Sequence, residues 1–386
     1  MLVSSALRWM NGAASSAPVD KRKLLGFTDN RQDAALQAGH FNDFLFVSLL
    51  RAATLAAIRK EGAEGLAEED FGRRVQQALG FIATNQARRQ EWMLDPETRG
   101  PSLNDAERTL SRVIAHRVWV DQRRGWRFTN PNLEELGLVR AHYVGLDELA
   151  ADEAAFEGGP QELHAATADQ RKNALCVLLD TLRRGLAVTA EMLEPSEVES
   201  LANASRQRLR EPWSISAQEH QRRAAALIID APRREEAGVR GEPLIVRGGP
   251  QSRLARELRH PRIWRKRLDP ETYRKVVEAL LKAAASYEIV RSVSTSFDVE
   301  GWRLAANSLR LFEAEGRADG RLANPYFGGA MRRVLDSIDA ELTAEAAPWA
   351  RSSSLAVIRS AGSVSTLSIL RTLRIGCVPA MLVPQA

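Results

Sequence analysis

The chain has 386 residues, of which 44% are hydrophobic and 27% charged, which suits a globular protein of two or three domains and excludes a disordered chain. No apolar run approaches the roughly 20 residues that a spanning helix needs, and no basic region precedes the first apolar stretch, so we expect no membrane partner, no signal peptide and a cytoplasmic protein. The net charge of +5, carried mainly by arginine, suits a nucleic-acid partner, although a GC-rich genome would produce the same arginine and alanine bias.

The residue types that most often carry catalysis or metals are sparse. Cys176 and Cys377 form no CxxC pair, and we interpret them as reduced thiols. The six histidines are spread singly, without zinc-ligand spacing, so we predict no metal site. No Ser-His-Asp or Cys-His arrangement can be argued, and acidic pairs such as Glu68–Glu69 and Glu134–Glu135 are interpreted as solvent-exposed charge.

The first predicted elements are a strand and a long helix. Lys23–Phe27 is a short apolar run bounded by polar residues, typical of a buried parallel strand. Asp29 or Asn30 is placed to cap the helix that follows. We expect that helix to bend near Gly39 and to stop at Gly62.

Residues 63–232 are predicted to form a helical accessory region with one β-hairpin. Phe71, Val75 and Leu79 share a helical face. The other predicted elements are a helix from Asp105 to about Arg117, a hairpin of strands 118–120 and 126–128, and a helix over 168–184 between a Thr167 cap and Gly185.

Residues 233–345 are predicted to form a winged-helix-like domain behind an exposed loop at 230–242. Asp269 is placed as an N-cap and Pro270 at the first helical position of a helix with one apolar face. Strands at about 287–293 and 301–306 follow, joined by a polar loop. A helix that leads into a two-stranded wing is how a winged helix ends.

The C-terminal segment 346–386 differs in composition, because its 41 residues contain no acidic side chain. We interpret it as an atypical tail, either the product of a frameshift or an unusual basic tail. Sequencing the gene around codons 345–350 decides between the two.

The stretch from Lys21 to Ala35, KRKLLGFTDNRQDAA, resembles the start of the second RecA-like domain of DEAD/DEAH-box helicases of superfamily 2, in their large bacterial type. The likeness continues through residues 37–44, QAGHFNDF. It implies that residues 1–62 begin a RecA-like domain. A strand that feeds a helix N-terminus presents free amides to anions. Thr28, Asn30 and Arg31 would then contact the phosphates of a nucleic-acid strand, unless Asp29 and Asn30 merely cap the helix and Arg31 pairs with Asp33.

A nucleotide site is missing from the sequence. No G-x-x-x-x-G-K-[ST] loop occurs, and the chain has no Gly-Lys pair. Residues 152–155 (DEAA) superficially match a DEAD box, but they follow an acidic helical stretch and are interpreted as a solvated helix face. Residues 316–321 resemble an arginine-finger motif but lack the glutamine that precedes it. We therefore expect no cofactor in this chain. The resemblance implies ATP and Mg in the parent helicase, with the first RecA-like domain on an upstream chain.

Two shorter stretches, 125–138 and 301–309, also resemble this helicase group. A third, residues 253–267, carries seven Arg or Lys against one Glu, with an embedded tryptophan. It is either a phosphate-tracking groove with a stacking aromatic or a solvated helix face whose tryptophan fills the core. The candidate nucleic-acid-binding residues here are Arg253, Arg256, Arg262, Trp264, Arg265, Lys266 and Arg267.

The sequence thus predicts a mainly α protein with a small α/β element: a partial RecA-like strand–helix unit followed by helical and winged-helix-like domains. The expected function is that of a helicase or translocase fragment that contacts DNA, as single strand or duplex, and is inactive alone as an ATPase. The alternatives are a stand-alone winged-helix DNA-binding protein and a structural interaction protein without DNA affinity.

Overall fold

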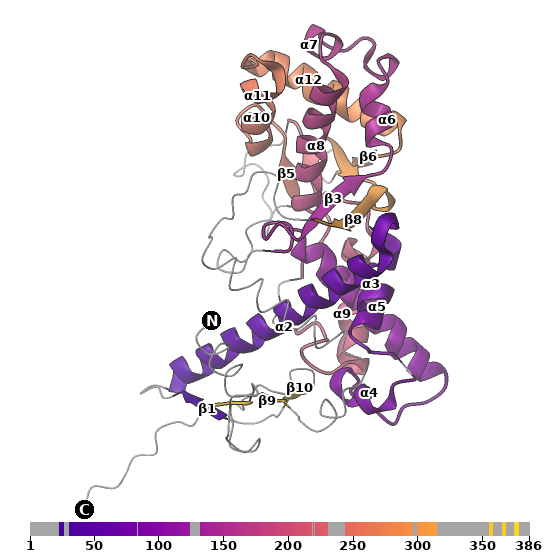
Figure 1. Ribbon diagram of the computed structural model, residues 1–386, viewed down its shortest axis with the longest axis vertical. Helices are drawn as coiled ribbons and strands as arrows, with labels where there is room; N and C mark the ends of the chain where they lie inside the picture. Colours follow the sequence, from indigo (N-terminus) through magenta and orange to yellow (C-terminus); the bar gives the residue numbers. More distant parts are fainter. Residues whose placement is uncertain are drawn as a thin grey trace, which may run out of the picture.

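The computed structural model describes residues 23–26, 31–82, 84–123, 132–217, 219, 221–230, 244–295, 299–314, 355–357, 365–367 and 374–377, with side chains from residue 46 to 314. The protein is mainly α-helical with small sheets, as the sequence predicts. The molecule is elongated, with one group of helices at each end of its long axis and a short sheet between them (Figure 1). Among the described residues, no helix has both the length and the apolar character that crossing a membrane requires.

The lower group of helices packs around the C-terminal part of the long helix α2 (Arg31–Glu61). Its other members are α3 (Phe71–Ala78), α4 (Gln86–Trp92), α5 (Pro101–Asp121) and α9 (Pro195–Arg208). α2 is one continuous helix, and it ends where the sequence predicts, because Gly62 adopts a positive φ of 56°. Phe71, Val75 and Leu79 are all fully buried, which confirms their predicted shared face.

The hairpin expected at 118–128 is wrong in its first strand. Residues 118–120 belong to the last turn of α5, which ends at Asp121. Val118 and Trp119 favour strands, but both are buried, and the Trp119 ring packs 5.7 Å from that of Phe71 on α3. This packing outweighs the weak local preference. The predicted partner strand, 126–128, lies outside the described residues.

A three-stranded antiparallel sheet lies between the two helical groups, and we call it the waist sheet (Figure 1). Its strands are β2 (Leu66–Ala67), β8 (Leu309–Glu313) and β3 (Val139–Tyr143), with β8 in the middle. The register places Arg140 opposite Phe312 and His142 opposite Arg310. Short 3₁₀ turns adjoin it at η2 (Gly62–Glu64), η3 (Glu68–Asp70) and η6 (Ala306–Ser308).

The upper group of helices surrounds α8 (Ala168–Arg184), which contacts α6, α10, α11 and α12. The predicted caps are confirmed: Thr167 forms a capping box with Gln170, and the Asp269 side chain accepts from the Glu271 and Thr272 amides of α12. The bounds are α6 (Leu146–Ala151), η4 (Ala154–Phe156), α7 (Gln161–His164), α10 (Arg253–Leu258), α11 (Pro261–Trp264) and α12 (Pro270–Ser286), with η5 (Glu191–Leu193) before α9.

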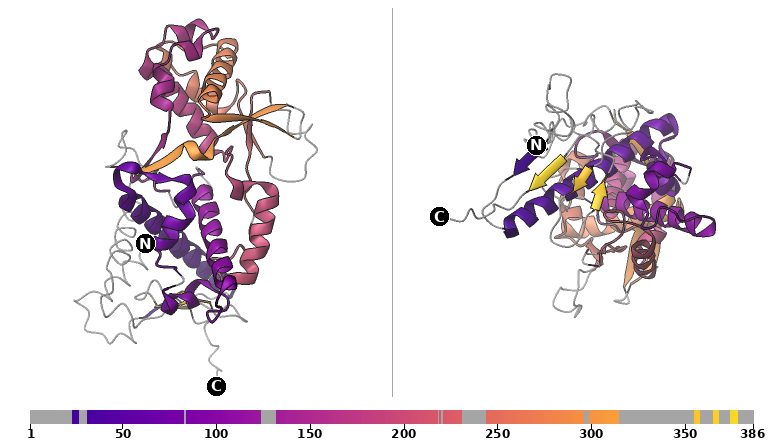
Figure 2. Two further views of the ribbon diagram at one scale, coloured as in Figure 1. Left: turned by 90° about the vertical axis from the view of Figure 1, so that its right-hand side faces the viewer. Right: turned by 90° about the horizontal axis from the view of Figure 1, so that it is seen from below.

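A second sheet has the order β5-β4-β7-β6 and projects sideways from the upper half in the left view of Figure 2. Its strands are β5 (Ile245–Arg247), β4 (Ala226–Ile228), β7 (Glu300–Leu304) and β6 (Val290–Ser294). The β6–β7 hairpin after α12 confirms the two predicted strands. β4 and β7 pair across the expected domain boundary at 232–233, so the sheet joins residues from both sides of it. Most of the loop expected at 230–242 lies outside the described ranges.

The N-terminal strand β1 (Lys23–Gly26) precedes α2 and pairs in parallel with β11 (Arg374–Cys377). This strand and its parallel pairing agree with the prediction for Lys23–Phe27. In the C-terminal segment, β9 (Leu355–Val357) pairs antiparallel with β10 (Ser365–Leu367). The side chains of these four strands are not among those described.

Candidate nucleic-acid interface

The basic segment 253–267 forms two short helices and a turn. The Ser252 hydroxyl accepts from the Ala255 amide at 3.0 Å and so starts α10. His260 Nδ1 accepts from the Arg262 amide at 3.2 Å, and Pro261 opens α11. Leu254, Ala255, Leu258 and Ile263 are buried, whereas the cationic side chains, the partly buried Arg259 excepted, are exposed. The segment is therefore amphipathic, with an apolar side on α8 and a cationic side in water.

The cations of this segment differ in their partners. Arg253 pairs with Glu257 at 3.0 Å, and Lys266 pairs with Glu162 of α7 at 2.9 Å. Arg262 contacts His260 Nδ1, which is not a carboxylate. Arg256, Arg265 and Arg267 are exposed, and no carboxylate in the described part of the chain forms an ion pair with them. These three guanidinium groups therefore carry charge that is not compensated locally.

Trp264 corrects the sequence-based hypothesis of a stacking aromatic. Only 7% of its surface is exposed, and its indole N–H donates to the Leu258 carbonyl at 2.5 Å. A base can stack only on a ring face that solvent reaches. The structure thus favours the alternative, in which Trp264 fills the core beneath α11 and anchors the turn that carries Arg265.

A cleft of about 300 Å³ opens beside this turn, between α7, the start of α8 and α11. Arg265 forms its rim in a left-handed conformation with a φ of 62°, which holds the residue out of the preceding helix. The hydrogen bond from Lys266 lowers the pKa of Glu162, so this carboxylate keeps its charge beside the cations. The lining residues are Gln161, Glu162, Ala165, Ala166, Thr167, Gln170, Trp264, Arg265 and Lys266.

The N-terminal candidate site is described only in part. Arg31 is the first residue of α2, so the helix begins where the sequence places the phosphate-binding turn. Thr28 and Asn30 lie outside the described residues, as does the side chain of Arg31. The role of these residues in nucleic-acid binding therefore stays a prediction.

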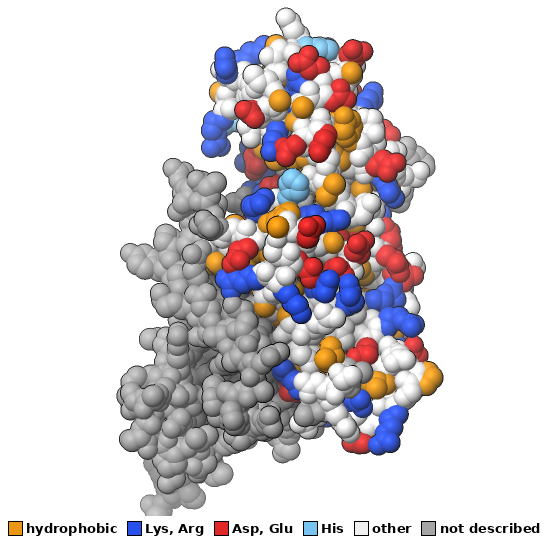
Figure 3. Space-filling view, turned by 45° about the vertical axis from the view of Figure 1, so that its right-hand side comes forward, with side chains coloured by type: hydrophobic (Ala, Val, Ile, Leu, Met, Phe, Trp, Pro, Cys, Tyr) orange, Lys and Arg blue, Asp and Glu red, His pale blue; other side chains and the backbone are white. Residues whose placement is uncertain are grey.

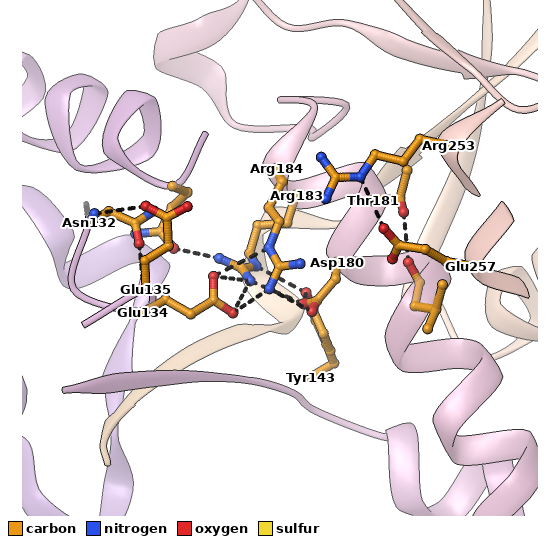
Figure 4. Close-up of polar contacts among 12 residues, drawn as sticks. Asn132, Glu134, Glu135, Tyr143, Asp180, Thr181, Arg183, Arg184, Arg253 and Glu257 are labelled. Atoms are coloured by element: carbon orange, nitrogen blue, oxygen red, sulfur yellow. Dashed lines mark hydrogen bonds and ion pairs between the residues drawn. The ribbon is translucent and has the colours of Figure 1, made fainter. Parts of the chain in front are cut away.

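A buried ionic network is the feature that sequence analysis missed (Figure 4). Glu134, interpreted above as solvent-exposed, accepts from Arg183 at 2.9 Å and from Arg184 at 2.7 Å. Asp180 accepts from Arg183 at 3.0 Å and from the Tyr143 hydroxyl at 2.7 Å. The network ties the waist sheet and the turn at residue 134 to the end of α8. In the sequence, the only local indication of this network is the i,i+3 and i,i+4 spacing of Asp180 with Arg183 and Arg184.

Burial alone would raise the pKa of Glu134, but the charges and hydrogen bonds of Arg183 and Arg184 outweigh it and lower the pKa to about 2. Burial raises the pKa of Tyr143, assisted by the neighbouring Asp180 carboxylate. The tyrosine therefore stays neutral and donates. Every charged group of the network has a partner, so it is a structural cross-link between elements.

Glu68 also departs from the expected solvated charge, since its carboxylate accepts from the Trp119 indole at 3.2 Å and burial raises its pKa. Glu69 and Glu153 are exposed as expected. Within the described ranges, no three His, Cys, Asp or Glu side chains gather as metal ligands.

Comparison with known proteins gives no relative: no family model, no curated protein and no solved structure matches the chain. The functional interpretation therefore rests on the residues and their arrangement.

Proposed function

We propose that the chain is the DNA-contacting part of an ATP-dependent helicase or translocase of superfamily 2 and that it holds no triphosphate site of its own. The resemblance of residues 21–44 to the start of a second RecA-like domain supports this proposal. The order of β1 and α2 is compatible with it, because a parallel strand is followed along the chain by a helix. In this proposal Thr28, Asn30 and Arg31 contact the strand's phosphates.

The upper half supports the proposal through its order of elements. α8, α10 and α12 precede the β6–β7 hairpin, and β4 flanks β7 on the side away from β6. A helix followed by a two-stranded wing is the order expected of a winged-helix unit, a frequent DNA-binding module. We interpret α8, α10 and α12 together with the β6–β7 hairpin as such a unit, with α12 as its third helix.

The observation that carries the DNA contact is the set of uncompensated cations on the basic segment. Arg256, Arg265 and Arg267 are exposed on one segment, and no described carboxylate neutralises them. Figure 3 shows that acidic and basic side chains are otherwise interspersed over the face it presents. A local concentration of unpaired guanidinium groups is therefore a better guide to a phosphate partner than the small net charge.

A salt-dependent titration tests this contact. The full chain binds a fluorescent DNA oligonucleotide between about 50 and 200 mM salt, and the variant Arg256→Ala/Arg265→Ala/Arg267→Ala loses affinity at every salt concentration. Each lost phosphate contact flattens the slope of log affinity against log salt by about 0.7 to 0.9. The matched control, Arg73→Ala/Arg108→Ala/Lys172→Ala, removes the same charge from residues paired with Asp70, Asp105 and Asp147. Equal losses in both variants would refute a localised site.

The second candidate is a stand-alone winged-helix DNA-binding protein without enzymatic ties, favoured by the same helix–hairpin arrangement. It predicts the same titration results. An adjacent upstream reading frame with a P-loop and a DEAH-like box supports the helicase proposal, and its absence favours the second candidate.

A further inference from the structure

The outer face of the waist sheet combines an aromatic ring with cations. Strand residues alternate between faces, and along β3 and β8 Val139, Tyr143, Leu309 and Leu311 are buried inside. The opposite face carries Arg140, His142, Arg310 and Phe312, all of them at least partly exposed. The register places Arg140 directly across from Phe312 and His142 across from Arg310, so the four side chains form one compact patch.

The Phe312 ring is held in place from both flanking strands. On the β3 side, the Arg140 guanidinium lies over the ring, 4.7 Å from its centroid. The His142 ring meets it edge-on at 5.8 Å. On the β2 side lies Gly65, where a Cβ would come within 2.7 to 2.9 Å of three ring atoms. The ring therefore depends on a glycine at this position, and its orientation is fixed before any ligand arrives.

The patch carries two guanidinium groups that form no ion pair within the part of the chain that the structure describes. Neither Arg140 nor Arg310 forms an ion pair with a carboxylate of the described chain, and Arg310 donates to the Asn307 and Leu309 carbonyls. Glu313, the carboxylate on β8, forms an ion pair with Arg59 at 2.7 Å. Glu68 interacts electrostatically with Arg310 but forms no ion pair with it, and its carboxylate accepts from the Trp119 indole at 3.2 Å. The patch thus presents a planar cation, two rings and a second guanidinium to solvent.

We propose that this face binds single-stranded nucleic acid, with one base stacked on the Arg140–Phe312 pair and a phosphate held by Arg310. The flat face of a base can stack on the guanidinium that already covers the ring, and the phosphate of the nucleotide can form an ion pair with Arg310. A duplex hides its base faces, so the patch selects unpaired strands. This site adds to the proposed function a contact that is separate in the fold from the basic segment, because the waist sheet and α10–α11 are different elements.

The test separates stacking from charge. The full chain is titrated with a fluorescent oligothymidylate and with the same oligomer carrying abasic sites. Phe312→Leu keeps an apolar side chain but removes the ring, and Arg140→Lys keeps the charge but removes the plane. Each variant weakens binding of the normal strand by about 5- to 100-fold and changes binding of the abasic strand little. The controls are Ile82→Ala and Arg108→Ala, which remove an exposed apolar side chain and an exposed cation elsewhere.

Wild-type affinity of Phe312→Leu for the normal strand would overturn the proposal. Equal weakening on normal and abasic strands would also overturn it, since the ring would then act through the fold or the backbone. Thermal melts accompany each titration to show that the variants are folded. If the triple arginine variant binds DNA as tightly as wild type, the proposed function is refuted. If that variant loses affinity but Phe312→Leu does not, only the present inference is refuted.

Discussion

The Arg51 guanidinium of α2 forms a bidentate ion pair with the Asp121 carboxylate at the end of α5, with N–O distances of 2.7 to 3.1 Å. The Arg51 side chain is 1% exposed and that of Asp121 is 12% exposed. The Asn132 amide donates to the Asp121 carbonyl at 3.1 Å, so the same corner also holds the chain where it leaves for the waist sheet. The ion pair thereby joins α2 to α5, and the hydrogen bond from the Asn132 side chain attaches the entry to β3 at the same corner.

Removing one partner of this pair destabilises the fold. Arg51→Ala leaves the Asp121 carboxylate buried without its cation, and we expect the free energy of unfolding to fall by about 3 to 5 kcal/mol. Urea denaturation measures the loss. The control Arg73→Ala breaks the solvent-exposed pair with Asp70 and costs less than about 1 kcal/mol. An Arg51→Ala loss as small as that of the control would contradict the structural role of the pair.

Glu134 makes stability depend on pH at the acidic end. Its pKa is lowered from 4.5 to about 2 in the folded protein, so the unfolded chain takes up the proton first as pH falls. The stabilisation is complete above pH 4.5 and is lost as pH falls towards 2, by on the order of 3 kcal/mol. Glu134→Gln therefore lowers stability at pH 7 and differs less from wild type near pH 3. Denaturation curves at both pH values, with Glu97→Gln as an exposed control, check this; a pH-independent difference would argue against it.

His116 has its effect in a higher pH window. Burial lowers the pKa of His116 from 6.5 to about 4. Its Nε2 lies 3.1 Å from the Arg222 carbonyl and donates to it, while Nδ1 has no hydrogen-bond partner among the described residues. Because the unfolded chain binds the proton more tightly, stability is complete above pH 6.5 and is lost between 6.5 and 4, by on the order of 3 kcal/mol.

The variant His116→Gln tests this window, because it removes the titrating group. Its stability falls less steeply than that of wild type between pH 6.5 and 4. His164→Gln, at an exposed position on α7, serves as control and follows the wild-type curve. Parallel curves for wild type and His116→Gln would show that the ring does not titrate as described.

ATP hydrolysis by this chain is expected to be at background level, with or without single-stranded DNA, because the sequence contains no Gly-Lys pair and hence no P-loop. A coupled ATPase assay with an oligothymidylate measures it, and an established helicase in parallel shows that the assay responds. Robust turnover by the purified chain would reveal a nucleotide site of another kind.

Local signals predicted the helices well. The caps at Thr167 and Asp269 and the stop at Gly62 were read from single residues, since a cap acts within one helical turn. The β6–β7 hairpin followed from its polar loop between two apolar runs. Where local preference and packing disagreed, as at Val118 and Trp119, packing decided, and sequence alone gives no measure of it.

Long-range relationships escaped prediction. β8 pairs with β2 and β3, which lie far earlier in the chain, and no spacing rule connects them. The burial of Trp264 and the capture of Glu134 by Arg183 and Arg184 also depend on which elements meet in space. The basic segment was visible as composition, but the Arg140–Phe312 patch was not, because its residues come from two distant strands.

The central position of β8 has a consequence for synthesis on the ribosome. A nascent chain that has emerged only to residue 300 has made both β2 and β3, yet Leu66 and Tyr143 still lack the strand that lies between them. The apolar side chains that β8 covers therefore stay exposed to solvent until Leu309–Glu313 has been synthesised and can pair with β2 and β3. Chaperone demand during translation should thus drop abruptly once this strand leaves the exit tunnel.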